Sequence, residues 1–303
     1  MQKTVIIIAG PTASGKTALA LQLAAHFKTS IISADSRQCF RELSIGVAKP
    51  TEKELQQARH YFINSHSITE EVSAQAFEEY ALKCVSEIFE NNDVAIMAGG
   101  TGLYIKAFCE GLDEIPATDE NIRKQIIDNY NKQGLQWLQH EVQQQDPQFW
   151  AVAEQQNPQR LMRALEVKLS TGKSIISFRT NKKNIRPFSI IKTGIDVPKE
   201  QLHENINRRT DEMMQAGLEN EVKQLIKYKH LNALQTVGYS EMFEYLAGKT
   251  DLEKAVELIK VHTRQYAKRQ MTWFKKDKEI FWINPLTEKD LLFQFIADRL
   301  RHE

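Results

Sequence analysis

An α/β fold with a parallel sheet, interrupted by an all-helical insertion, is the fold class that the sequence predicts. Apolar runs at 5–9 and 94–98 alternate with helical segments at 17–27 and 74–91, which is the pattern of a doubly wound core. The runs lack polar alternation, as expected of strands that are buried on both faces of a parallel sheet. The Gln-rich stretch 119–170 has a helical pattern and contains no strand candidate, which indicates the insertion.

The other elements of the core follow in order along the chain. The apolar pair at 31–32 predicts a short second strand that ends in polar residues, and the segment 188–197 predicts a fourth strand. Helices are expected again from about 200 to 277. The simplest organisation has a core of residues 1–114 and 186–303, with C-terminal helices, and a helical insertion at 115–185.

Composition and charge narrow the possible partners. The chain has 303 residues, of which 42% are hydrophobic and 26% are charged, and these values exclude a disordered, collagenous or coiled-coil protein. A net charge of +1 by itself argues against a nucleic-acid partner, but it averages two unlike halves. Residues 1–150 contain 13 Lys and Arg against 19 Asp and Glu, whereas residues 151–303 contain 27 against 20. Only the second half favours a polyanion.

The cysteines and the N-terminal segment predict the compartment. Cys39, Cys84 and Cys109 are far apart and form no C-x-x-C pair, which excludes a zinc finger or a disulfide framework and is typical of a reducing cytoplasm. The first apolar run has only five residues and no cleavage-site pattern after it, so neither a signal peptide nor a membrane span is expected. We therefore expect a cytoplasmic protein without a membrane role.

The segment GPTASGKT at 10–17 matches the phosphate-binding pattern G-x-x-x-x-G-K-[ST] without a mismatch. It follows a predicted strand and opens a predicted helix, so a purely structural glycine turn is the weaker interpretation. Backbone N–H groups and the helix N-terminus favour a phosphate cluster, Lys16 adds positive charge, and Thr17 offers a hydroxyl to Mg²⁺. The loop predicts a polyphosphate ligand without saying which one. Its predicted binding residues are Gly10, Pro11, Thr12, Ala13, Ser14, Gly15, Lys16 and Thr17.

An acid is expected beside this loop, at the end of the second strand. The strand at 94–98 ends in Gly99-Gly100-Thr101-Gly102, without the Mg²⁺-holding carboxylate that phosphoryl transfer requires there. Carboxyl ends of parallel strands open onto one crevice, so Asp35 can hold a metal-bound water, act as a general base, or merely cap the following turn. The segment 99–102 either brings backbone and one hydroxyl to the crevice or is a plain strand-to-helix turn.

Basic residues of the second half gather in three places. Gln159, Arg160 and Arg163 share one helical turn, and Asn207-Arg208-Arg209 are expected to begin a helical stretch. Either set can be an ordinary solvated face. The segment 260–278 interleaves Lys and Arg with Tyr266, Trp273 and Phe274. Charge for phosphates and flat rings for stacking suit a nucleic acid with exposed bases, and the alternative is an amphipathic helix with snorkelling lysines.

Seven segments, taken together, resemble the bacterial tRNA dimethylallyltransferases, also called tRNA isopentenyltransferases. In order they are GPTASGKT, SADSRQ, IGVAKP, GGTGLYIKA, NPQRLMRALEV, TVGYSEMFEYL and TRQYAKRQMTWFKK, and they extend from about residue 4 to 276. The resemblance implies a P-loop NTPase-like core that transfers a dimethylallyl group from dimethylallyl diphosphate to N6 of adenosine 37. The acceptors are tRNAs that read codons beginning with U. The loop then holds the donor diphosphate with Mg²⁺ as cofactor, and the protein is expected to be a monomer.

The family's residue roles carry over to matching positions. Asp35 resembles the acceptor of the N6 proton, and Thr12 resembles the hydroxyl that touches the leaving diphosphate. Thr101 falls on a catalytic-site threonine, and Arg209 falls on an arginine that grips diphosphate oxygens. The target base is flipped out of an anticodon stem-loop carrying adenosines at 36, 37 and 38, and Gln38 and its neighbours read it. Contacts to tRNA are implied for Asp35, Ser36, Arg37, Gln38, Thr101, Arg123, Gln159, Arg160, Leu161, Met162, Arg163, Gln235, Gly238, Tyr239, Lys268, Arg269, Gln270 and Trp273.

Two departures and two alternatives accompany this resemblance. Cys39-Phe40 stand where the family usually has Val-Tyr, and Arg59-His60-Tyr61 stand where Pro-His-His is common, both near the expected substrate mouth. A small-molecule kinase or an adenylate isopentenyltransferase would share the loop and Asp35. A non-catalytic P-loop RNA-binding protein would need no general base. The helical insertion and the basic segment favour the tRNA enzyme, because a free nucleotide requires neither.

Overall fold

The computed structural model describes residues 2–180 and 182–302, which form two compact units. The core unit comprises the residues up to Glu110 and those from Ile185 onwards, and the helical unit comprises Gly111–Asn184. The helical unit is thus inserted between two elements of the core. Within the described residues, no helix has both the length and the apolar character that crossing a membrane requires.

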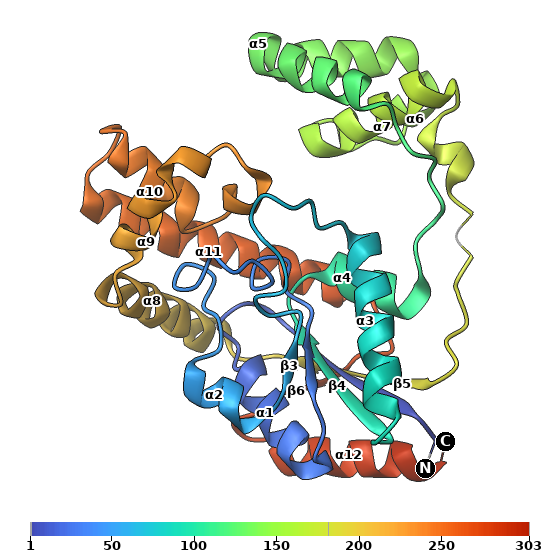
Figure 1. Ribbon diagram of the computed structural model, residues 1–303, viewed down its shortest axis with the longest axis vertical. Coiled ribbons are helices and arrows are strands. Elements are labelled where there is room, and N and C mark those ends of the chain that lie inside the picture. Colours follow the sequence, from blue (N-terminus) through green and yellow to red (C-terminus); the bar gives the residue numbers. More distant parts are fainter. Residues whose placement is uncertain (1, 181, 303) are drawn as a thin grey trace. The chain divides into compact units, whose positions relative to one another are not determined.

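One parallel sheet with the strand order β3-β2-β4-β1-β5-β6 forms the centre of the core unit, which confirms the α/β fold class (Figure 1). The predicted strands are confirmed as β1, β2, β4 and β5, with ends that differ by at most two residues. The edge strands β3 and β6 were not predicted, because runs of two and three residues carry no periodic signal. The strands are β1 (Thr4–Ala9), β2 (Ile31–Ser33), β3 (His60–Tyr61), β4 (Val94–Gly99), β5 (Ser189–Ile195) and β6 (Phe281–Ile283).

The register of the central strands brings distant loops together. Ala9 at the end of β1 pairs with Gly99 at the end of β4, and Ser33 at the end of β2 pairs with Ala98. Because all three strands are parallel, the segments that leave them open at the same edge of the sheet. The phosphate-loop segment 10–17, the segment 34–38 and the turn 99–102 therefore become neighbours.

Helices cover both faces of this sheet (Figure 1). Alternate residues of β1 enter two separate hydrophobic clusters, Val5 and Ile7 in one, Ile6 and Ile8 in the other. The α8 helix begins at Lys199, so Arg209 lies in the middle of it and not at its start as expected. The core helices are α1 (Lys16–Phe27), α2 (Glu52–Gln57), α3 (Ala74–Phe89), α4 (Gly102–Glu110), α8 (Lys199–Gln215), α9 (Leu218–Gln224), α10 (Tyr239–Leu246), α11 (Leu252–Phe274) and α12 (Lys289–His302), with 3-10 turns at Ile226–Tyr228 and Asn232–Leu234.

The helical unit has a hydrophobic core of its own. Leu138 and Val142 pack with Leu161 and Leu165, and all four side chains are buried. As the pattern predicted, no residue of 119–170 lies in a strand, and the structure describes every residue of that stretch. Its elements are α5 (Glu120–Gln145), interrupted by the non-helical Gly134, α6 (Pro147–Trp150), α7 (Pro158–Thr171) and a 3-10 turn at Ile175–Phe178.

Candidate active site

The phosphate loop joins β1 to α1 in the conformation that anion binding requires. Gly15 adopts a left-handed φ of 93° at the N-cap of α1, which a residue with a side chain rarely adopts. No side chain caps this helix, and its first turn contains no acid. The N–H groups of that turn therefore keep their capacity to bind an anion, and the helix dipole favours negative charge there.

Lys16 is the principal cation of the loop. Its Nζ donates a hydrogen bond to the carbonyl oxygen of Pro11 at 2.5 Å. Burial and, to a smaller extent, the nearby Arg209 lower the pKa of Lys16 to about 7, and Asp35 opposes this shift. A buried ammonium that lacks an anionic partner is costly, so this site favours a ligand that brings negative charge.

Arg209 reaches the loop from α8. Its Nη1 donates to Oγ1 of Thr12 at 3.4 Å. One helical turn earlier, Nδ2 of Asn205 donates to the carbonyl oxygen of Ala13 at 3.1 Å, which holds α8 against the loop. Burial lowers the pKa of Arg209, but a guanidinium stays charged at neutral pH. The phosphate loop therefore has two cations, Lys16 within it and Arg209 beside it.

Asp35 leaves β2 beside this cationic site. Its Oδ1 accepts hydrogen bonds from the backbone N–H groups of Arg37 at 2.9 Å and Gln38 at 3.3 Å. The turn-capping role that the sequence left open is therefore real. Both bonds go to one oxygen, so capping and proton transfer can be served by the two oxygens of one carboxylate.

The turn 99–102 brings Thr101 to the segment after β2. Oγ1 of Thr101 accepts from the N–H of Ser36 at 3.1 Å, and its own N–H donates to the carbonyl oxygen of Ala34 at 3.2 Å. A Cβ on Gly99 would lie 2.1 Å from that carbonyl oxygen. The segment 99–102 is therefore both a strand-to-helix turn and a part of the site. The close approach of its backbone to Ala34 brings the Thr101 hydroxyl to the segment after β2.

We expect Gly99→Ala to lower the free energy of unfolding of the protein by about 1–3 kcal/mol, as overpacking of a core does. The added methyl would meet the Ala34 backbone, which cannot move without disturbing β2. Urea denaturation measures the change. Gly134→Ala is the control, because its Cβ meets nothing within 4 Å and tests backbone strain alone. Wild-type stability of the Gly99 variant would contradict the close approach.

Two cavities of the core unit meet at Asp35. The smaller, of about 250 Å³, is lined by the phosphate loop and by apolar residues that include Pro50 and Ile63. The larger, of about 540 Å³, is lined by Arg37, Arg269 and the segment 235–241, apart from Tyr239. Both are lined in common by Thr12, Asp35, Val47, Ala48, Arg209 and Tyr266.

Glu221, which the sequence did not indicate, holds the segment 44–46 that leads into Val47 and Ala48, two residues that line both cavities. Its carboxylate accepts from the backbone N–H groups of Ser44, Ile45 and Gly46 at 3.0, 2.8 and 3.0 Å, and from the Tyr239 hydroxyl at 2.6 Å. A Cβ on Gly46 would lie 2.6 Å from the Tyr239 ring. No local signal could have found Glu221, which is one of several acids on an ordinary surface helix.

Gln38 fastens the same segment to the end of β2. Its Nε2 donates to the carbonyl oxygens of Val47 and Ala48 at 3.3 and 3.0 Å, and its Oε1 accepts from Oγ of Ser33 at 3.2 Å. The side chain that was expected to read the target base therefore makes three contacts within the protein. Reading of the base by Gln38 remains a prediction.

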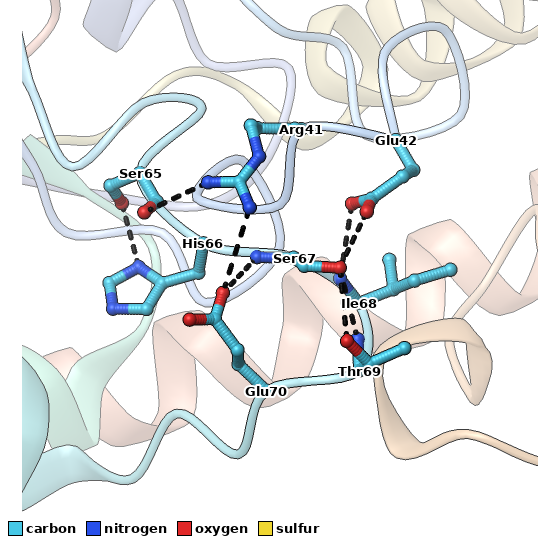
Figure 2. Close-up of polar contacts among 8 residues, drawn as sticks. All are labelled: Arg41, Glu42, Ser65, His66, Ser67, Ile68, Thr69 and Glu70. Atoms are coloured by element: carbon cyan, nitrogen blue, oxygen red, sulfur yellow. Dashed lines mark hydrogen bonds and ion pairs between the residues drawn. The ribbon is translucent and has the colours of Figure 1, made fainter.

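Beyond Gln38, the chain is tied to the loop 65–70 (Figure 2). Glu42 accepts from Oγ of Ser67 at 2.6 Å and from the N–H of Ile68 at 3.0 Å. Arg41 donates to the carbonyl oxygen of Ser65 at 3.3 Å (Figure 2). The atypical pair 39–40 precedes these contacts and is buried, so its departure from the family pattern affects packing.

The other atypical segment lies nearer the smaller cavity. His60 lines that cavity, and its Nδ1 lies 2.8 Å from the carbonyl oxygen of Ala58. Tyr61 is buried, and the Arg59 guanidinium lies over its ring. Only His60 of this segment therefore faces the site.

Most of the residues expected to contact tRNA fall into three groups. Around the larger cavity lie Asp35, Ser36, Arg37, Gln235, Gly238 and Arg269. On the helical unit, Arg123 and Arg163 pair with the buried Glu166 at 3.8 and 3.3 Å, and Arg160 pairs with Glu154 at 2.9 Å. The side chains of Leu161, Met162, Tyr239 and Gln270 are buried and pack inside the protein.

The basic segment 260–278 has features of both an amphipathic helix that packs on the core and a surface with exposed aromatic rings. Lys260, Arg264 and Lys275 form ion pairs with acids of the core unit at 2.7, 3.2 and 2.5 Å. Phe274 is buried and cannot stack on a base. Tyr266 and Trp273 are each 37% exposed, so aromatic faces remain at the surface of α11.

This fold and site define a P-loop protein of the α/β class, with two cations and a carboxylate around one phosphate loop and a helical unit inserted in the core. A family model described as IPP transferase matches residues 38–277. The chain belongs to the IPP transferase family.

Curated proteins and solved structures are similar over most of their length. The tRNA dimethylallyltransferase of Cytophaga hutchinsonii is 47% identical over 285 residues, which cover 94% of each chain. The tRNA dimethylallyltransferase 1 of Bacteroides thetaiotaomicron is 42% identical over 99% of this chain and 97% of its own. The crystal structure of the tRNA isopentenylpyrophosphate transferase from Bacillus halodurans matches with a TM-score of 0.72 at 32% identity, covering all of both chains. A eukaryotic dimethylallyltransferase acting on tRNA matches with a TM-score of 0.75 at 25% identity, over 93% of this chain and 74% of its own.

Proposed function

We propose that this chain is a tRNA dimethylallyltransferase, which transfers the dimethylallyl group of dimethylallyl diphosphate to N6 of adenosine 37 and releases diphosphate. Membership of the IPP transferase family supports the activity. The observation that carries the assignment of the site is the position of Asp35 where the two cavities meet. A donor in the smaller cavity and a base that enters from the larger one would meet at this carboxylate.

The donor diphosphate is proposed to lie on the loop 10–17, between Lys16 and Arg209. These two cations can balance most of the charge of a diphosphate. The dimethylallyl group would then lie along the apolar part of the smaller cavity. The proposed walls of this slot, which the sequence did not indicate, are Val47, Ala48, Pro50 and Ile63.

Mg²⁺ fits this site as a companion of the donor. Thr17 lines the smaller cavity in the first turn of α1, where a hydroxyl can ligate the ion. The described residues contain no group of three or more His, Cys, Asp or Glu that could hold a metal by themselves. Thr17 and the diphosphate oxygens are therefore the proposed ligands, and the ion would neutralise part of the charge on the departing diphosphate.

The chain's own residues account for the rest of the reaction. The N6 nitrogen forms a bond to C1 of the allylic chain as the bond between C1 and the diphosphate oxygen breaks. Asp35 accepts the N6 proton, which compensates for the poor nucleophilicity of an amine conjugated to a ring. Lys16 and Arg209 stabilise the negative charge that develops on the leaving group, and Thr12 and Thr101 orient the reacting groups.

Incubation of the protein with radiolabelled dimethylallyl diphosphate, Mg²⁺ and an unmodified anticodon stem-loop tests this function. The stem-loop carries adenosines at 36, 37 and 38, and we expect label on adenosine 37 alone. A stem-loop with guanosine at 37 and free AMP are the controls, and neither should become labelled. Labelling of AMP would support an adenylate isopentenyltransferase, and ATP-dependent phosphorylation without prenyl transfer would overturn the proposal.

We further propose that the protein acts as a monomer in the reducing cytoplasm. Cys39, Cys84 and Cys109 are buried free thiols. Burial raises the pKa of Cys39 to about 12 and that of Cys84 to about 11, so both remain protonated and unreactive.

A further inference from the structure

Gln270 of α11 joins two loops of the donor site through its side-chain amide. Its Oε1 accepts a hydrogen bond from the N–H of Thr12 at 2.8 Å, and its Nε2 donates to the carbonyl oxygen of Gly100 at 2.9 Å. The side chain is only 7% exposed. One amide therefore spans the phosphate loop and the turn that carries Thr101.

The two partners of the Gln270 amide fix the orientation of its oxygen and nitrogen, and its surroundings leave little free space. A Cβ on Gly100 would lie 2.2 Å from Nε2 of Gln270, so the glycine at 100 makes room for the amide. One partner is a donor and the other is an acceptor, and the neutral amide of Gln270 presents an acceptor oxygen and a donor nitrogen side by side at its end. A carboxylate could satisfy Thr12 but not Gly100, and an apolar side chain could satisfy neither.

The contact to Thr12 determines how the loop faces its ligand. Because the Thr12 N–H is engaged by Gln270, the backbone at this position is held while the Thr12 hydroxyl lies toward Arg209, 3.4 Å from its Nη1. The same amide holds the carbonyl that precedes Thr101. Both threonines that are proposed to orient the reacting groups are thus adjacent to Gln270 contacts.

The neighbours of Gln270 on α11 point elsewhere. Lys268 and Arg269 are exposed, and Arg269 lines the larger cavity, where the acceptor is proposed to enter. Gln270 is buried and lines the smaller cavity. Adjacent residues of α11 therefore line the two cavities separately.

We propose that Gln270 is a positioning residue for the donor diphosphate and does not bind tRNA through its side chain. The inference rests on the proposed placement of the donor on the loop 10–17. Loss of the amide would leave the Thr12 N–H and the Gly100 carbonyl without partners. The loop would then lose the orientation in which it grips a diphosphate, while the surface of α11 would stay intact.

The test compares Gln270→Met and Gln270→Glu by their dissociation constants for dimethylallyl diphosphate and for the unmodified stem-loop. We expect Gln270→Met to weaken donor binding about tenfold, as the loss of two hydrogen bonds predicts, and to change stem-loop binding less than twofold. Gln270→Glu should weaken donor binding further, because it adds negative charge beside the diphosphate. In steady state, the KM for the donor should rise while the KM for tRNA stays constant.

Arg269→Gln is the matched control on the adjacent residue, and it should weaken stem-loop binding without changing donor binding. Stem-loop binding that falls in the Gln270 variants with donor binding unchanged would overturn the inference. An equal loss of both affinities, accompanied by a lower Tm, would also overturn it, because that result indicates a general structural role. Gln270→Glu keeps the hydrogen bond from the Thr12 N–H and is the test variant if Gln270→Met does not fold.

Lys16→Met separates this inference from the placement of the donor. If Lys16→Met leaves donor binding unchanged, the donor does not lie on the loop and the proposed site fails. If Lys16→Met weakens donor binding but both Gln270 variants bind the donor normally, the site stands and the role of Gln270 alone is wrong.

Discussion

Replacement of Asp35 by Asn is expected to lower the rate of dimethylallyl transfer by about 10²–10⁴-fold, the usual contribution of a general base. The amide oxygen of Asn can still accept from the N–H groups of Arg37 and Gln38, which Asp35 binds at 2.9 and 3.3 Å. The turn after β2 is therefore preserved. What the variant lacks is an oxygen that can take the N6 proton, so chemistry is lost while the fold is kept.

Single-turnover measurements with both substrates saturating isolate this effect from binding. The dissociation constants of the variant for the donor and for the stem-loop should stay close to those of the wild type. Glu54→Gln is a matched control, because this carboxylate also accepts from a backbone N–H nearby, that of Thr51 at 2.7 Å, and has no proposed role in the reaction. A rate for Asp35→Asn within tenfold of the wild type would place the base elsewhere.

Removal of the Lys16 ammonium is expected to weaken binding of dimethylallyl diphosphate by about 100-fold or more, as the loss of a partly buried charge–charge interaction predicts. In the free protein, the Lys16 ammonium donates a hydrogen bond to the Pro11 carbonyl oxygen at 2.5 Å. Lys16→Met keeps the length of the side chain and removes its charge. Titration of the variant with donor and Mg²⁺ measures the loss, and an unchanged affinity would contradict the site.

The pH dependence of donor binding provides a second measurement on the same residue. Burial and Arg209 lower the pKa of Lys16 to about 7, and a bound diphosphate would raise it again. Below pH 7 the ammonium is already formed, whereas above pH 7 binding must take up a proton. The dissociation constant should therefore rise above pH 7, by up to about tenfold per pH unit.

Lys16→Arg is the control for this pH profile. A guanidinium stays charged throughout the range from pH 6 to 9, so any pH dependence that remains in the variant belongs to the diphosphate or to other groups. The difference between the two profiles belongs to Lys16. Identical profiles would show that Lys16 keeps its proton in the free protein.

Most of the core and the chemical part of the site were predictable from local patterns. The strands β1 and β4 are continuous apolar runs, and such runs occur where both faces of a parallel sheet are covered. The loop 10–17 has its motif within one segment, between a strand and a helix. Asp35 was placed beside it by a general property of parallel sheets, namely that carboxyl ends share one edge.

The positions that needed the tertiary structure are those whose partners are distant in sequence. Gln270 contacts Thr12 across 258 positions, and Glu221 holds Ser44 across 177. Neither residue differs locally from the other polar residues of a surface helix. The burial of Tyr239 and Leu161 could not be predicted either, because a helical pattern does not indicate which side of the helix other elements will cover.

The sequence by itself therefore determined the fold class, the phosphate loop, Asp35 and, through its resemblance, the family, because each depends on residues that are close together or on a general rule of sheets. Only the tertiary structure decided which residues hold these groups in place. The resemblance placed Gln270 among the tRNA contacts, and its burial and its two loop contacts place it behind the donor site. Contacts between distant segments form only when the chain folds, and no local pattern records them.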